Sequence, residues 1–310
     1  MPNGKVVVVG AMNMDVVVTT ANLPQKGESV IGSPIQLYPG GKGANQAVAA
    51  ALVGAPTTLI SMRGDDDYGR SLLESIVAAG VDTGLIAVSE DEKTGTAVIV
   101  VDSHGDNTIV ISPGANNQIT AQVADEALRQ LDRPAVVSVC GELQLSTIKA
   151  ALETASELGA VSVLNLSPYN RDAIALLPLA QVLVVNQHEA ADITGQSNAA
   201  ADWRATAAAF AAVGSTLVVV TLGADGAMVL DCQNLEVAPF KVEAIQVRAV
   251  DTTGCGDAFT GSLCAELASG KSLTDAAKFA VQVAGFAATS AGAQVSYGSR
   301  SQVENLVQAS

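Results

Sequence analysis

Runs of apolar, β-branched residues alternate with longer Ala-rich segments along most of the chain, and this alternation limits the possible folds. The first run, residues 5–10, is nearly all valine and lacks the polar alternation of a half-exposed strand. Such a run is typical of a strand covered on both faces. Helical segments separate it from further strand-like runs at 57–62, 135–140, 160–164, 181–185 and 216–221. This order predicts an α/β fold with helices on both faces of a mostly parallel sheet.

Two β-rich stretches interrupt the alternation. The first carries short β-type runs between prolines and glycines, at 16–20, 29–31 and 35–38. The second is a pair of β-type runs around a hairpin-like turn, at 95–102 and 107–112. We expect the two stretches, about 14–39 and 94–112, to form one small β-sheet lid inserted in a single domain spanning 1–310. The exposed face of this lid could also pair two subunits into a homodimer.

The composition excludes several functional classes. A formal net charge of −15 argues against binding to nucleic acid or to an anionic membrane surface. No apolar stretch approaches the ~20 residues of a membrane span, and the N-terminus lacks the pattern of a secretion signal. The four cysteines form no C-x-x-C pair, and Cys140, Cys232 and Cys264 lie in apolar runs, as small core residues do. We therefore expect a cytoplasmic protein.

A glycine-rich stretch at 251–259 joins a strand-like run at 245–250 to an apolar helical run at 258–267. Glycine lets the backbone approach a ligand closely, and the first N–H groups of a helix carry a partial positive charge. These groups could hold a phosphoryl group while Asp257 accepts a proton from an attacking hydroxyl. The alternative is a Gly-capped turn in which Asp257 is an ordinary residue of the first helical turn.

A second glycine-rich stretch, at 39–46, opens an Ala-rich helix that extends to Leu52. Its glycines suit a backbone close to a ligand, and hydrogen-bond donors are offered by Gly41, Lys42, Gly43 and Asn45. A flexible loop before the helix is the alternative, although so many glycines cost chain entropy that a ligand site would justify.

Polar residues follow several predicted strands, at the edge where open α/β sheets bind ligands. Asn13 and Asp15 suit hydrogen bonds to a polyol, although both could instead cap or turn the chain. Glu142 places an acid at the end of another strand. Asn186 and Glu189 offer oxygens suited to hydrated Mg²⁺, whereas Glu189 could instead be a first-turn acid favoured by the helix dipole.

Two loops complete the set of candidates. Residues 221–226 form a Gly-flanked loop after a strand, which suits either a nucleotide or a tight β-turn. Residues 290–296 follow a predicted helix at 273–289, and free carbonyl groups in such a loop can bind a monovalent cation. Residues 9–13 lack the G-x-G-x-x-G fingerprint, which disfavours a nicotinamide-dependent oxidoreductase.

Residues 40–46 and 251–257 resemble the two signatures of the ribokinase-like (PfkB) carbohydrate kinases, and the N-x-x-E at 186–189 falls in the expected interval. The resemblance covers nearly the whole chain and implies a ribokinase-like, three-layer α/β/α fold with a small β-sheet lid. It implies transfer of a phosphoryl group from ATP to the primary hydroxyl of a pentose, and residues 13–15 and 114–116 favour D-ribose, giving D-ribose 5-phosphate. Fructose, 2-keto-3-deoxygluconate or a nucleoside are alternative acceptors, and a non-catalytic sugar-binding sensor is an alternative class.

The resemblance also assigns roles to residues. Asp257 would be the catalytic base, and the anion hole would consist of the amides of Gly254, Cys255 and Gly256. The residues implied at the sugar are Asn13, Asp15, Gly41, Lys42, Gly43, Asn45, Glu142 and Asp257. The residues implied at ATP are Asn186, Thr221, Leu222, Gly223, Ala224, Asp225, Gly226 and Gly256.

Two metal ions are implied as well. Mg²⁺ would bind with ATP and be organised through water by Glu189 and Asn186. An activating K⁺ would be held, mostly through carbonyl oxygens, by Asp251, Thr253, Ala287, Ser290, Gly292 and Ser296. One residue departs from the family pattern, since Val281 stands where some members carry a histidine near the adenine.

Overall fold

The computed structural model describes residues 4–309, and its centre is a nine-stranded sheet. Its strands lie in the order β13-β12-β11-β10-β9-β8-β1-β4-β5. In chain order they are β1 (Val6–Val9), β4 (Thr57–Gly64), β5 (Ile86–Ser89), β8 (Val136–Cys140), β9 (Val161–Asn165), β10 (Val182–Asn186), β11 (Leu217–Thr221), β12 (Ala227–Asp231) and β13 (Phe240–Val242). Among these strands, β12 alone runs antiparallel to the rest. The predicted α/β fold with a mostly parallel central sheet is therefore confirmed. Residues 1–3 and 310 of the expected domain lie outside the described part.

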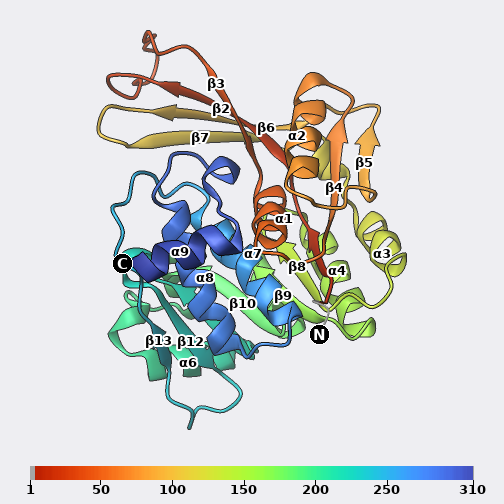
Figure 1. Ribbon diagram of the computed structural model, residues 1–310, viewed down its shortest axis with the longest axis vertical. Helices are drawn as coiled ribbons and strands as arrows, with labels where there is room; N and C mark the ends of the chain where they lie inside the picture. The colour runs from red at the N-terminus through yellow and green to blue at the C-terminus, as the bar shows by residue number, and fades with distance from the viewer. Residues whose placement is uncertain (1–3, 310) are drawn as a thin grey trace.

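Helices cover both faces of this sheet (Figure 1). In β1, Val6 and Val8 enter one core and Val7 and Val9 enter the other, so the all-valine run is buried on both sides. The first core is completed by α1 (Lys42–Leu52), α2 (Asp67–Ala78), α7 (Cys255–Ala268), α8 (Leu273–Ala287) and α9 (Arg300–Ala309). The second core is completed by α3 (Ala121–Arg129), α4 (Leu145–Glu157), α5 (Gln187–Thr194) and α6 (Trp203–Ala212). The predicted core cysteines Cys140, Cys232 and Cys264 are buried.

A second, four-stranded sheet has the order β3-β2-β6-β7. Its strands are β2 (Asn13–Thr19), β3 (Gln36–Gly40), β6 (Gly95–Val101) and β7 (Asn107–Ser112). β2 pairs with β6 in parallel, and the other two pairs are antiparallel. In the view of Figure 1 this sheet extends away from the main body, above α9. All six residues of β7 are exposed.

Short 3-10 segments connect several elements, namely η1 (Gly114–Gln118), η2 (Arg171–Leu179), η3 (Ala199–Ala201), η4 (Gly223–Asp225) and η5 (Gln294–Ser296). In the part of the chain that the structure describes, no helix is both long and apolar enough to cross a membrane.

Two strands expected from apolar runs are absent from the described chain. Residues 29–31 form no strand, and Ile31 is 98% exposed. Residues 245–250 also form no strand. This segment instead lies alongside α8 in space: Ile245 lies against Gly285, and the amide of Val250 donates to the carbonyl of Ala288. Its apolar side chains therefore contact a helix, which the strand-like pattern did not distinguish from sheet pairing.

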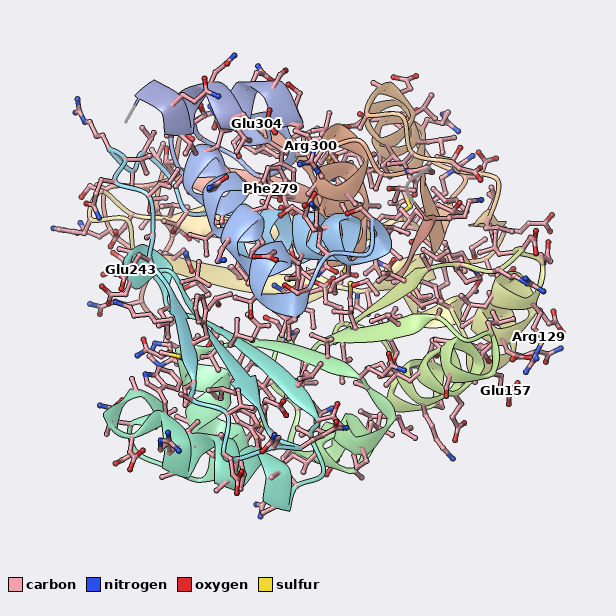
Figure 2. The ribbon with its side chains drawn as sticks, turned by 60° about the horizontal axis from the view of Figure 1, so that its bottom comes forward. Arg129, Glu157, Glu243, Phe279, Arg300 and Glu304 are labelled. Carbon is pink, nitrogen blue, oxygen red and sulfur yellow. The ribbon has the colours of Figure 1, made fainter. Side chains whose placement is uncertain are left out.

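The C-terminal helix α9 is fixed to the body by Arg300 (Figure 2). Its guanidinium stacks over the ring of Phe279, 4.2 Å from the ring centroid. It also forms an ion pair with the buried Glu266 on α7, and its Nε donates to the carbonyl of Val53 at 3.0 Å. Arg300 therefore joins α9 to α7, to α8 and to the end of α1.

Candidate active site

The N-terminus of α7 is formed by a glycine that no other residue could replace without strain. Gly254 has φ 74°, in the left-handed region. A Cβ at this position would lie 2.5 Å from the Tyr297 hydroxyl, which donates to the Gly254 carbonyl at 2.9 Å. At Gly256, by contrast, an added Cβ would meet nothing within 4 Å. Gly256 therefore faces open space, where a ligand could reach the first N–H groups of the helix.

One of the three predicted anion-hole amides is already engaged. The amide of Cys255 donates to the carbonyl of Thr252 at 3.2 Å, within the turn that enters α7. Burial raises the pKa of the Cys255 thiol to about 11, with Asp251 and Asp257 adding to the effect. This thiol is therefore neutral near neutral pH, and the stretch works through its backbone.

Asp257 lies in the first turn of α7 and is 6% exposed. One carboxylate oxygen accepts from Asn45 Nδ2 at 2.9 Å, and the other accepts from Gln46 Nε2 at 3.3 Å. Both donors come from α1, whose start is packed tightly by Gly41 (φ 88°), where a Cβ would lie 2.6 Å from the amide nitrogen of Asn13. The two glycine-rich stretches of the sequence therefore meet at Asp257.

Three further charged side chains surround Asp257. Burial, with the nearby Asp257 charge, raises the pKa of Asp15 to about 6, against the opposing effect of Lys42. Burial likewise raises the pKa of Glu142 to about 7, which Lys42 opposes and Asp257 reinforces. The charge of Asp257 in turn raises the pKa of the Lys42 ammonium, although burial opposes it. Carboxyl groups that titrate near neutral pH can both donate and accept hydrogen bonds, as a polyol requires.

The backbone joins these side chains into one cluster. The Lys42 amide donates to Glu142 Oε2 at 2.9 Å, which ties the start of α1 to the end of β8. Asp15 lies against Gly40, where a Cβ would approach its Oδ2 to 2.3 Å. Asn13 is only 3% exposed, and its Oδ1 accepts from Asn116 Nδ2 at 2.8 Å. The Oδ1 atom of Asn13 is thus already hydrogen-bonded within the protein.

A cavity of about 710 Å³ opens beside this cluster. Twelve of the predicted site residues line it, and they are Lys42, Asn186, Glu189, Thr221, Leu222, Gly223, Ala224, Gly226, Gly254, Cys255, Gly256 and Asp257. Val281 also lines it, whereas Asp225 does not. Lys42 and Asp257 lie at the boundary between the cavity and the carboxylate cluster, so the two halves of the predicted site are adjacent.

Asn186 and Glu189 form a capping box at the start of α5. Asn186 Oδ1 accepts from the Glu189 amide at 2.9 Å, and Glu189 Oε2 accepts from the Asn186 amide at 2.8 Å. No cluster of three or more metal-ligating His, Cys, Asp or Glu side chains occurs within residues 4–309. This arrangement fits a hydrated ion held through water and does not offer a closed cage of protein ligands.

The segments predicted to hold a monovalent cation are joined by Asp251. Its Oδ2 accepts from the Gly292 amide at 2.8 Å, and its Oδ1 accepts from the Thr253 amide and hydroxyl at 2.9 and 2.7 Å. Partial burial would raise the pKa of Asp251, but these hydrogen bonds outweigh it and lower the pKa. These contacts occupy the Asp251 carboxylate, so the oxygen ligands left for a cation are mainly backbone carbonyls, which suits K⁺.

Three buried amides take part in the site although the sequence patterns assigned no role to them, namely Gln46, Asn165 and Gln294. Gln46 Nε2 donates to Asn165 Oδ1 at 3.0 Å, and Gln294 Nε2 donates to Asn45 Oδ1 at 3.0 Å. Gln46 follows directly on the glycine-rich stretch, and Asn165 ends a strand, which are the two signals that could have indicated them.

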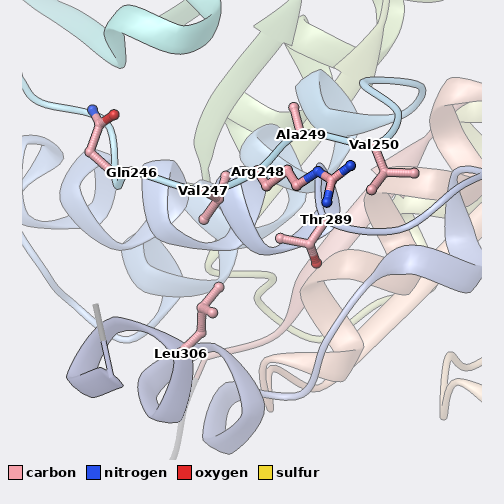
Figure 3. Close-up of a pocket in the computed structure, with 7 residues that line it drawn as sticks. All are labelled: Gln246, Val247, Arg248, Ala249, Val250, Thr289 and Leu306. Carbon is pink, nitrogen blue, oxygen red and sulfur yellow. The ribbon is translucent and has the colours of Figure 1, made fainter.

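A second cavity, of about 620 Å³, is bordered by the segment that precedes α7 in the chain and by residues after α8 and on α9 (Figure 3). It is lined by residues 246–250, Thr289 and Leu306, and Arg248 is the one ionisable side chain among them. It offers no base beside an anion-binding backbone, so the chemistry of the first cavity is not repeated here.

The family model described as pfkB family carbohydrate kinase matches residues 3–299. Over 300 residues the chain is 34% identical to ribokinase of Bacillus subtilis (strain 168), which covers 97% of this chain and 98% of that protein. It is 30% identical over 299 residues to deoxyribokinase of Salmonella typhi, with 96% of each protein covered. The structure of Arabidopsis thaliana ribokinase complexed with ribose and ATP matches with a TM-score of 0.86 and 27% identity, over 98% of this chain and 99% of that chain. The chain therefore belongs to the pfkB family of carbohydrate kinases and is a sugar kinase.

Proposed function

We propose that this sugar kinase transfers the γ-phosphoryl group of ATP to the primary hydroxyl of D-ribose, giving D-ribose 5-phosphate. The observation that carries the proposal is the position of Asp257, a buried carboxylate between the Asp15–Glu142–Lys42 cluster and the open N-terminus of α7. Ribokinase of Bacillus subtilis resembles the chain over nearly its full length, and the related Arabidopsis protein binds ribose together with ATP.

In this proposal Asp257 accepts the proton of the ribose hydroxyl as the phosphoryl group is transferred. The backbone amides of Gly254 and Gly256 at the start of α7 neutralise the charge that develops on the transferred group, and the Cys255 amide joins them if its hydrogen bond to Thr252 opens. Asp15, Glu142 and Asn45, with the backbone of Gly41 and Gly43, bind the sugar hydroxyls, and Asn13 supports them from its buried position.

ATP occupies the cavity lined by Asn186, residues 221–224 and Gly226, with Asp225 beside it in the same loop. Mg²⁺ bound with ATP, and held through water by Glu189 and Asn186, would supply additional neutralisation of phosphate charge. K⁺ would be held by Asp251 and Thr253 together with Ala287, Ser290, Gly292 and Ser296, and would fix the turn from which α7 starts.

The four-stranded sheet serves in this proposal as a lid over the sugar and as the contact between two subunits. Val98, Ile109, Val110 and Ile111 are each 45–63% exposed on it, and such apolar area is usually covered in an assembly. Light scattering would test this: we expect a dimer, and a monomer for the variant Ile109→Asp/Ile111→Asp. An unchanged mass for that variant would contradict the contact.

The activity is tested by ADP release from purified protein over a panel of sugars, with and without K⁺. We expect the highest kcat/KM with D-ribose and a lower rate when Na⁺ replaces K⁺. Faster turnover of 2-deoxyribose, fructose, 2-keto-3-deoxygluconate or a nucleoside would reject ribose as the substrate. Sugar binding without ADP formation under every condition would instead support a non-catalytic sensor.

A further inference from the structure

One of the two amide groups that hold the Asp257 carboxylate, that of Gln46, lies where no substrate can reach it. Gln46, which donates to Oδ1, is 0% exposed and lines neither cavity. Its side chain therefore acts on the reaction only through the residues it contacts. One of these contacts is Asn165, which ends β9 and lies between Gln46 and the strand β10.

The far end of this chain of amides determines which of their atoms donate hydrogen bonds and which accept them. The backbone carbonyl of Val184 can only accept a hydrogen bond, so the Asn165 atom facing it at 3.0 Å must be the Nδ2 donor. Asn165 Oδ1 then faces Gln46, so the Gln46 atom facing it at 3.0 Å must be Nε2. The remaining hydrogen of this amide points at Asp257 Oδ1.

The other end of the Gln46 amide agrees with this orientation. Gln46 Oε1 accepts from the Ser138 hydroxyl at 3.0 Å, and turning the amide over would set Oε1 against two acceptors, Asn165 Oδ1 and Asp257 Oδ1. Asn45 presents a second N–H to Asp257 Oδ2, and its own amide is held by Gln294. Each carboxylate oxygen of Asp257 thus faces a donor, and hydrogen bonds donated to a carboxylate favour its ionised form.

We propose that Gln46 and Asn165 are positioning residues that hold the Asp257 carboxylate in the orientation of a proton acceptor. This inference rests on the proposed role of Asp257 as the base. The competing account is that Gln46 is a core residue whose hydrogen bonds serve stability alone. The two accounts differ in the expected pH–kcat profile, because only in a positioning role does loss of the Gln46 donor change the hydrogen bonding of the reacting carboxylate.

The other titratable groups around Asp257 must be unchanged for this comparison. They are Asp15 on β2, Lys42 on α1, Cys140 and Glu142 at the end of β8, Cys255 on α7 and Tyr297 after η5. None of them has a hydrogen bond to Gln46 except Cys140, whose thiol donates to Gln46 Oε1 at 3.4 Å. A substitution that removes only the Nε2 donor therefore alters one interaction of the base.

The test compares Gln46→Met, which keeps length and removes both the Nε2 donor and the Oε1 acceptor, with Gln46→Glu, which keeps Oε1 and replaces only the donor by an acceptor. For Gln46→Met we expect kcat with ribose to fall about 10- to 100-fold at neutral pH, the effect of one hydrogen bond to a charged group. The KM values for ribose and ATP should change little, because Gln46 touches neither site. The acid limb of the pH–kcat profile should move to higher pH, so the defect shrinks as pH rises. Gln46→Glu should move it further.

The matched control is Thr154→Val on α4, a fully internal change remote from the cavity that removes a hydrogen bond to Asp125. It should lower stability without moving the profile. Asn165→Ala, which frees the Gln46 amide to turn, is the second variant if Gln46→Met does not fold. Because Asn165 also lines the larger cavity, this variant is measured at saturating ATP, where it should move the profile in the same direction by less.

A Gln46→Met enzyme with wild-type kcat and pH profile, or with changes no different from those of Thr154→Val, would overturn the inference. Wild-type protein that forms no ADP with any sugar would overturn the proposed function, and the inference with it. The two failures are distinguished by the wild-type arm of the same assay.

Discussion

Replacing Asp15 by asparagine should stabilise the unliganded protein at neutral pH while weakening its affinity for sugar. Asp15 lies on β2, against the backbone of Gly40 on β3, with Asp257 and Lys42 as its charged neighbours. Burial is the main reason that its pKa rises from 3.8 to about 6, and Asp257 adds to the shift. Its ionised form is therefore disfavoured in the unliganded protein, and a hydrogen bond from a sugar hydroxyl would stabilise it.

The size of the effect follows from this shift. A rise of about 2 pKa units corresponds to ~3 kcal/mol, and partial solvent exposure reduces the expected value to about 1–2 kcal/mol. Between pH ~4 and ~6 the folded protein binds more protons at Asp15 than the unfolded chain does. The free energy of unfolding therefore falls as pH rises through that window, and the loss is complete above it. The Asp15→Asn variant, whose amide does not titrate, should avoid that loss.

The assay is urea unfolding of both proteins without ligand, at pH values from 4 to 8. We expect the two unfolding free energies to converge near pH 4 and the variant to be more stable near pH 8. Asp132→Asn, at an exposed position, is the control and should differ from wild type by the same amount at every pH. Calorimetry should find ribose bound more weakly by Asp15→Asn. A variant that is less stable than wild type at pH 8 would refute the reasoning.

Two further substitutions test the packing of the body and of the anion-binding turn. Arg300→Met should lower the free energy of unfolding by about 2–4 kcal/mol, because it leaves Glu266 buried and unpaired. Arg129→Met breaks only exposed pairs and should lower it much less, so equal losses in urea unfolding would contradict this. Gly256→Ala should leave the free energy of unfolding unchanged or raise it by up to ~1 kcal/mol. It should nevertheless abolish ADP formation, because the added Cβ fills the space left for the phosphoryl group. Gly254→Ala should instead lower the free energy of unfolding by ~1–2 kcal/mol, because of the positive φ and the contact of the added Cβ with Tyr297. Activity retained by Gly256→Ala would place the phosphoryl group elsewhere.

Local patterns predicted most of the fold because the central strands are buried on both faces and are rich in valine. The errors lie where an apolar run forms no strand: residues 245–250 lie along α8, and the 29–31 run includes Ile31, which is 98% exposed. The short strands β5 and β13 at the two sheet edges, and β12 next to β13, were not predicted. Their pairing depends on neighbours that a local pattern does not contain.

The candidate site could be predicted from the sequence where the backbone conformation requires glycine. Gly254 and Gly41 adopt positive φ beside close neighbours, so glycine is needed there and the two stretches stand out. Gln46 and Asn165 carry no such mark, since a buried glutamine resembles any polar residue until its partner, 119 positions away, is known. The long-range hydrogen bonds of the site therefore required the structure.

The central claim is that Asp257 is the base of a ribose kinase, and Asp257→Asn tests it most directly. ADP formation with saturating ribose, ATP, Mg²⁺ and K⁺ should fall by at least ~10²–10⁴-fold, the usual contribution of a general base. Calorimetry on the same preparation should still detect ribose binding, because Asn45, Asp15 and Glu142 remain in place. Turnover near the wild-type rate, with ribose still bound, would contradict the account.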